Sequence, residues 1–76
     1  MKYIVEAFDK STELLAFEIE LPEGCDEKLA AIMGWSFLQR GDEGYDLDFS
    51  QIEAIEKLAE RSFYDNDHIF QLTCNV

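Results

Sequence analysis

Five oxygen-bearing side chains between residues 42 and 53 follow the spacing of a calcium-binding EF-hand loop. They occupy its first, fifth, seventh, ninth and twelfth places and are Asp42, Asp46, Asp48, Ser50 and Glu53. Calcium prefers oxygen ligands at such a spacing. The match is incomplete, because Gly44 has no ligating side chain for the third place and Leu47 stands where the loop needs glycine. We therefore expect no metal and no cofactor, but an acidic loop followed by a capped helix.

Two further side chains could take part in catalysis. His68 has Asp65 and Asp67 beside it, and a carboxylate can orient a histidine that acts as a base. Cys25 stands near the start of an expected helix, where a thiol can be activated, but its spacing to Leu29 favours a buried role. A lone histidine at the start of a strand is more often a surface residue. The sequence has no nucleophile elbow or phosphate-binding glycine loop, so we predict no catalytic residue and no enzyme.

The charge of the chain points to another kind of function. Seventeen Asp and Glu residues against six Lys and Arg residues give a formal net charge of −11. This charge repels phosphate backbones and anionic lipids, so we do not expect direct binding to nucleic acid or to a membrane. The same field attracts basic proteins and speeds their association. The alternative is acidity that serves solubility alone, and the charge by itself does not separate the two.

The acidic residues are densest between residues 41 and 67. This segment has nine acidic and two basic residues, a net −7 of the total −11. Aromatic residues lie in it and beside it, and aromatic anchors among charged groups are typical of binding hot spots. We predict that a partner contacts Trp35, Asp42, Glu43, Tyr45, Asp46, Asp48, Glu53 and Glu56. For Trp35 the alternative is burial beneath the loop.

The elements that would position these residues begin with a β-hairpin. Residues 2–8 and 13–21 are rich in strand-forming types and flank a polar turn at 9–12. The expected inward set of the second strand is Leu15, Phe17, Ile19 and Leu21. The expected inward set of the first strand is Tyr3, Val5 and Ala7, because Glu6 belongs to the opposite set.

A short helix should follow from Cys25 to Met33 and close at Gly34. Residues 35–48 then predict a long connection. Two overlapping capping boxes, at residues 48 and 51 and at residues 50 and 53, start a second helix that should end near Arg61. Its buried stripe would be Phe49, Ile52, Ile55, Leu58 and Ala59. Its solvated face would include Glu53, Glu56, Lys57 and Glu60.

A last strand is indicated by the alternation of Phe70, Leu72 and Cys74 with polar residues. The sequence thus predicts one α+β domain over residues 1–76. Its sheet would be three-stranded and mainly antiparallel, with two helices on one face and the element order ββααβ. With two cysteines, no signal-peptide layout and no long apolar run, we expect a cytoplasmic protein.

Three short segments resemble a family of bacterial proteins. They are residues 34–35 (Gly-Trp), residues 41–42 with 45–47 (Gly-Asp and Tyr-Asp-Leu), and residues 70–72 (Phe-Gln-Leu). The chain resembles small acidic immunity proteins encoded beside bacterial toxins, including those of contact-dependent growth inhibition and of nuclease bacteriocins. The resemblance implies a cytoplasmic inhibitor that binds one cognate toxin domain, often a nuclease. The alternatives are an acidic adaptor or regulatory subunit, or a DNA mimic that inhibits a DNA-binding protein.

Overall fold

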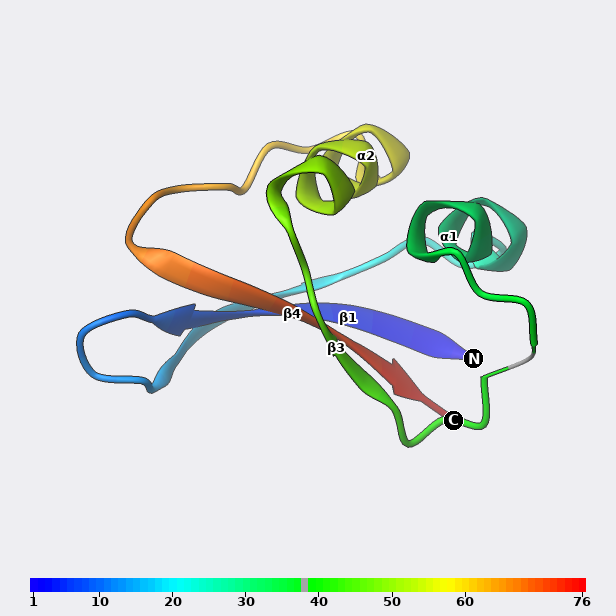
Figure 1. The fold of residues 1–76 in the computed structure, drawn as a ribbon, viewed down its shortest axis with the longest axis horizontal. Coiled ribbons are helices and arrows are strands. Elements are labelled where there is room, and N and C mark those ends of the chain that lie inside the picture. The colour runs from blue at the N-terminus through cyan, green and yellow to red at the C-terminus, as the bar shows by residue number, and fades with distance from the viewer. Residues whose placement is uncertain (38) are drawn as a thin grey trace.

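The computed structural model describes residues 1–37 and 39–76, and its elements follow the order ββαβαβ (Figure 1). They are β1 (Lys2–Asp9), β2 (Leu15–Glu20), α1 (Asp26–Met33), β3 (Gly44–Asp46), α2 (Phe49–Ala59) and β4 (His68–Asn75). The sheet has four strands in the order β2-β1-β4-β3, and each neighbouring pair is antiparallel. The α+β class and the two helices are confirmed. The three-stranded sheet and the order ββααβ are wrong, because the expected connection contains a strand.

β3 is short because it only fills the free edge of β4. Its three residues pair with residues 71–73. The pairing continues on both sides: the Cys74 N–H donates to the Glu43 carbonyl and the Leu47 N–H donates to the Phe70 carbonyl, each at 3.0 Å. A three-residue strand has no readable alternation, so its partner strand and not its own pattern determines it.

The centre of the sheet is the pair formed by β1 and β4. Eight residue pairs join them, from Lys2 opposite Asn75 to Asp9 opposite His68. Since side chains alternate between the two faces of a strand, each strand sends one set to the core. The buried sets are Tyr3, Val5 and Ala7 in β1 and Phe70, Leu72 and Cys74 in β4. The expected inward set of β1 and the expected alternation in β4 are confirmed, and both helices lie on this face (Figure 1).

The hairpin of β1 and β2 is confirmed, but Leu15 departs from its expected set. Ile19 and Leu21 are buried, and Phe17 packs against the core. The pairing register shifts by one residue beside Ala7, so Leu15 lies opposite Phe8 and its exposed fraction is 47%. A bulge adds one residue to a strand and re-aims the side chains beyond it.

The helix signals are confirmed at their ends. α1 stops at Gly34, which has a left-handed φ of 72°. The capping box of Asp48 and Gln51 starts α2, and Ile52 and Ile55 are buried. The second box does not form, because the Ser50 hydroxyl donates to the Asp48 carboxylate at 2.9 Å.

Phe49 is not part of the buried stripe. Its exposed fraction is 59%, and its ring packs edge-on against Tyr64 at 5.2 Å between centroids. Its ring therefore packs on the segment that follows α2 and not in the buried layer beneath the helix. In the part of the chain that the structure describes, no helix is long and apolar enough to cross a membrane.

The first prediction concerns the layer between the helices and the sheet. Leu29 of α1 is fully buried, whereas Leu14 in the β1–β2 turn is 69% exposed. Leu29→Ala should lower the free energy of unfolding by about 2–5 kcal/mol, because it removes buried methyl groups and leaves a cavity. Leu14→Ala should change it by less than about 0.5 kcal/mol. Urea denaturation of both variants checks this, and equal effects would contradict the helix placement.

The second prediction concerns the turn after β1. The Asp9 carboxylate accepts bonds from the Ser11 hydroxyl at 2.7 Å and from the N–H groups of Ser11 and Thr12 at 2.8 and 3.1 Å. These bonds lower the pKa of Asp9 to about 2, and the bond from the Ser11 hydroxyl has the largest effect. A lowered carboxyl pKa adds stability above the unfolded-state pKa of about 3.9, and this stability is lost as the pH falls through the folded-state pKa.

Asp9→Asn keeps the size of the side chain but removes its titration. At pH 6, we expect the wild-type protein to unfold at a higher midpoint concentration of urea than the variant does. The difference should shrink as the pH falls from about 4 to about 2. A difference that stays constant across this range would show that the Asp9 charge has no part in holding the turn.

Candidate functional site

Asp42 and Glu43 lie in the turn that leads into β3, but their surroundings differ. The Glu43 carboxylate accepts bonds from the N–H groups of Arg40, Gly41 and Asp42 at 2.8, 2.9 and 3.2 Å. These bonds lower the pKa of Glu43, and the bond from the Arg40 N–H has the largest effect. The Arg40 guanidinium also lies 3.6 Å from the Asp42 carboxylate. Glu43 therefore shapes the turn, whereas Asp42 is an exposed carboxylate beside one cation.

Trp35 and Tyr45 pack together at the edge of the core. Their ring centroids are 5.3 Å apart, and Trp35 lies 6.1 Å from the ring of Tyr3. The Tyr45 hydroxyl donates to the Gln39 side-chain carbonyl at 2.6 Å. Gln39 is buried, and its Nε2 has no hydrogen-bond partner among the described residues. Both predicted aromatic anchors are half-buried, so each offers a partner only part of its surface.

Asp46 and Asp48 stand at the two ends of the short link between β3 and α2. The Asp46 carboxylate is exposed and accepts a bond from Gln71 Nε2 at 3.0 Å. The Asp48 carboxylate caps α2 and accepts the Gln51 N–H at 2.8 Å. This bond is the main cause that lowers the pKa of Asp48, and the bond from the Ser50 hydroxyl is the second. Across residues 1–37 and 39–76, no group of three or more His, Cys, Asp or Glu residues could hold a metal ion.

Glu53 and Glu56 lie on α2 and have separate roles. Glu53 is exposed. The Glu56 carboxylate is half-buried and accepts the N–H groups of Phe63 and Tyr64 at 2.7 and 2.9 Å. The prediction of a solvated Glu56 is therefore wrong, because its carboxylate attaches the segment after α2 to the helix.

The eight predicted contact residues do not form one continuous face. β3 carries Asp46 to the face of the sheet that lacks helices, because Asp46 lies opposite Gln71, an outward residue of β4. α2, with Glu53 and Glu56, covers the other face (Figure 1). Asp42 and Asp46 belong to the exposed carboxylates of the β3 edge. Glu43, Asp48 and Glu56 instead accept backbone N–H bonds.

His68 and the two cysteines occupy structural positions. His68 Nδ1 lies 2.6 Å from the Asp65 carboxylate, and this hydrogen bond is the first cause that lowers the pKa of Asp65. The His68 ring packs on Phe17 at 5.2 Å, so it is half-buried and not the surface residue that the sequence suggests. Cys25 is buried, as expected, and this burial is the main cause that raises its pKa. Burial likewise raises the pKa of Cys74 to about 11, so both thiols are protonated at neutral pH.

The predicted set of residues leaves out the uncovered face of the sheet. Glu6 lies directly opposite Glu18 of β2 on one side and Gln71 of β4 on the other. Together with Asp46, these residues form a row across all four strands, which we call the acidic row: Glu18, Glu6, Gln71 and Asp46. Burial is the main cause that raises the pKa of Glu6, and the negative charge of Glu18 is the second. Strand alternation predicts that Glu6, Glu18 and Gln71 face outward, but only the register brings them together with Asp46.

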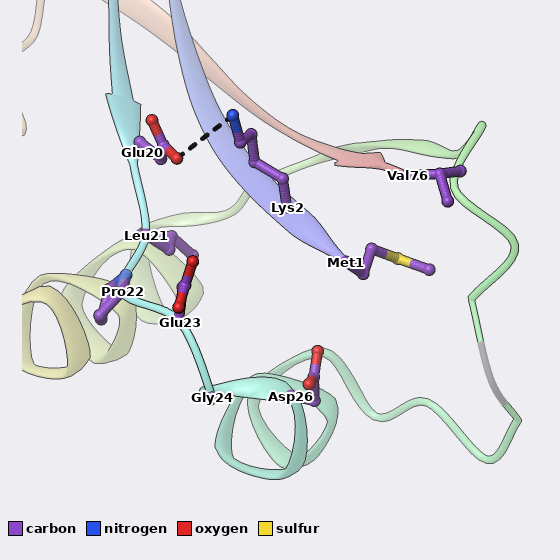
Figure 2. A pocket seen from close by; sticks show the side chains of 9 residues that line it. All are labelled: Met1, Lys2, Glu20, Leu21, Pro22, Glu23, Gly24, Asp26 and Val76. Carbon is purple, nitrogen blue, oxygen red and sulfur yellow. Dashed lines mark ion pairs between the residues drawn. The ribbon is translucent and has the colours of Figure 1, made fainter.

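A cavity of about 420 Å³ lies between the end of the hairpin and the start of α1 (Figure 2). Its charged side chains are Lys2, Glu20, Glu23 and Asp26. The Lys2 ammonium group lies 3.5 Å from the Glu20 carboxylate, as the dashed line in Figure 2 marks. Among the described side chains that line the cavity, Lys2 is the one cation, and it is already paired with Glu20. The cavity therefore suits an anionic ligand poorly.

A comparison with known families assigns the chain by sequence. The model of a family described as a domain of unknown function, DUF7683, matches residues 2–73, so the chain belongs to this family. The matched residues extend from β1 into β4 and include both helices. No curated protein matches the chain.

The third prediction separates the structural carboxylates from the solvent-exposed ones. Glu56→Ala should lower the free energy of unfolding by about 1–3 kcal/mol, because two N–H groups lose a charged acceptor. Glu53→Ala, on the same helix, is the matched control and should change it by less than about 0.5 kcal/mol. Thermal and urea denaturation check both values. An equal effect of the two substitutions would mean that Glu56 does not hold the segment after α2.

Proposed function

We propose that this domain binds a basic protein partner, and that the partner is a toxin domain, most specifically a nuclease, which the domain neutralises as an immunity protein. The observation that carries the proposal is the excess of unpaired carboxylates. Of the 17 acidic residues, three lie within 4.0 Å of a Lys or Arg side chain, Glu20, Asp42 and Glu43, and a fourth, Asp65, lies beside His68. The remaining thirteen have no ion-pair partner among the described residues.

The physical basis is competition with phosphate. A nuclease holds its substrate with Lys and Arg side chains, and carboxylates can occupy the same cations through charge-assisted hydrogen bonds. A net charge of −11 on a domain of this size also steers a basic partner toward it and raises the association rate. The resemblance to toxin-immunity proteins supports this choice over an acidic adaptor.

The proposal needs no catalytic step. The thiol pKa values of Cys25 and Cys74 are raised, so neither thiol is activated as a nucleophile. The histidine is held by Asp65 and packed on Phe17. The thiols and the histidine thus have structural surroundings, which supports a role in binding. The cytoplasm fits this role, because an immunity protein would meet its toxin there.

The fourth prediction tests the function with the protein encoded next to this gene. Co-expression of that protein with the domain should restore growth that the partner alone abolishes. The purified proteins should associate at least about tenfold faster at about 50 mM than at about 500 mM NaCl, because salt screens the steering field.

One double variant tests whether exposed charge drives the association. Asp42→Asn with Glu53→Gln removes two exposed charges without touching a cap, and it should slow association. A partner that has no effect on growth and forms no complex would contradict the immunity function. A complex with a DNA-binding protein that lacks toxicity would favour the DNA mimic.

A further inference from the structure

We propose that the uncovered face of the sheet is the surface that receives the cationic partner: an Arg or Lys of the partner enters between Glu6 and Glu18, and an apolar partner side chain covers Phe8 and Ile69. This inference rests on the proposed function and names the site at which it acts. The eight residues predicted from the sequence include one member of this face, Asp46.

The pairing register places two kinds of rows side by side on this face. The acidic row crosses all four strands through Glu6 and Glu18. Two residues further along β1, Phe8 lies opposite Ile69 on one side and Leu15 on the other. Two residues along a strand span about 7 Å, so one partner segment can contact both rows.

The second row is apolar and accessible. The exposed fraction is 47% for Leu15 and 49% for Ile69, and Phe8 is half-buried. A groove of about 320 Å³ lies at this row, with Phe8, Ile69 and Gln71 among the residues that line it. Neither helix shields these side chains, because both helices lie on the opposite face (Figure 1). Burial of this apolar area would contribute to binding, at roughly 25 cal/mol per Å² before the costs of association.

The acidic row sets the sign of the partner. Like charges directly opposite each other in a sheet repel, and among the described residues neither Glu6 nor Glu18 lies within 4.0 Å of a cation. Lys2, on the same strand as Glu6, is paired with Glu20. The raised pKa of Glu6 reflects burial and this repulsion. A guanidinium group can donate to both carboxylates, and it would replace the repulsion with two charge-assisted hydrogen bonds.

Other occupants and other surfaces fit less well. A second copy of this chain would place one acidic row against another, so self-association through this face is disfavoured. The groove of about 590 Å³ along α1 and α2 has two cations among its lining residues, Lys28 and Lys57. That groove is less suited to a basic partner than the uncovered face is.

The fifth prediction uses a probe that does not depend on the toxin. The probe is a short capped peptide with the repeat Arg-Ser-Leu-Ser, in which Arg and Leu lie two residues apart and so face the same side of an extended chain. Its control is the same peptide with Glu in place of Arg. Titration of the labelled domain, followed by backbone amide NMR, should shift the resonances of residues 4–8, 16–20 and 69–73 most. The Glu peptide should shift none of them. Largest shifts on α2, or shifts spread over the whole surface, would overturn the inference.

Two double variants with the same change in charge complete the test. Glu6→Gln with Glu18→Gln should weaken peptide binding about tenfold and should unfold no more easily than wild type, because a repulsion is removed. Glu27→Gln with Glu60→Gln, at exposed positions of α1 and just after α2, should weaken it less than about threefold. Equal losses would mean that only total charge matters and would overturn the inference. If the peptide binds as expected but the neighbouring toxin does not, the immunity function fails and the surface assignment stands.

Discussion

The antiparallel pairing of β1 with β4 is the constraint on which the rest of the fold depends. These strands come from opposite ends of the chain, yet they form the centre of the sheet and each holds one edge strand. A hairpin of β1 and β2 alone would be marginal in water, so the core forms only when β4 joins it and the helices cover it. Because side chains alternate in β1 and β4, the same pairing that builds the core also builds the uncovered face.

Carboxylates in this domain have two different roles. Asp9, Glu43, Asp48 and Glu56 each accept backbone N–H groups at a turn, a helix start or a segment end. Such bonds satisfy donors that regular structure leaves unpaired, so these acidic residues stabilise the fold in spite of the net charge. Within residues 1–37 and 39–76, the carboxylates of the acidic row accept no backbone bond of this kind. Part of the acidity is therefore structural, and a count of acidic residues overstates what is available to a partner.

Local signals account for what the sequence predicted correctly. The Asp48 capping box, the αL position of Gly34 and the alternation in β1 and β4 each involve residues close together in the chain. β3 was missed because its position depends on the free edge of β4, some 25 residues away in sequence. Leu15 was misplaced because a bulge beside Ala7 changes the register after a regular pattern.

The candidate site was less predictable than the fold for the same reason. The sequence shows a dense acidic segment, but the structure uses Glu43, Asp48 and Glu56 for backbone contacts. Glu6 and Glu18 stand apart from that segment, one in each strand of the hairpin, and nothing in their local sequence distinguishes them from ordinary outward residues. Their significance depends on register, which is a property of pairs of strands.

The acidic row and its apolar neighbour would contribute differently to recognition. Apolar contact at Phe8 and Ile69 is not selective for charge and would supply affinity to many surfaces. The Glu6 and Glu18 carboxylates act in the opposite way: they repel an acidic segment and favour one that carries a cation at the correct spacing. A partner that places an apolar residue and a cation about two strand residues apart satisfies both rows at once. Selectivity would then come from this spacing, whereas net charge alone would attract any basic protein.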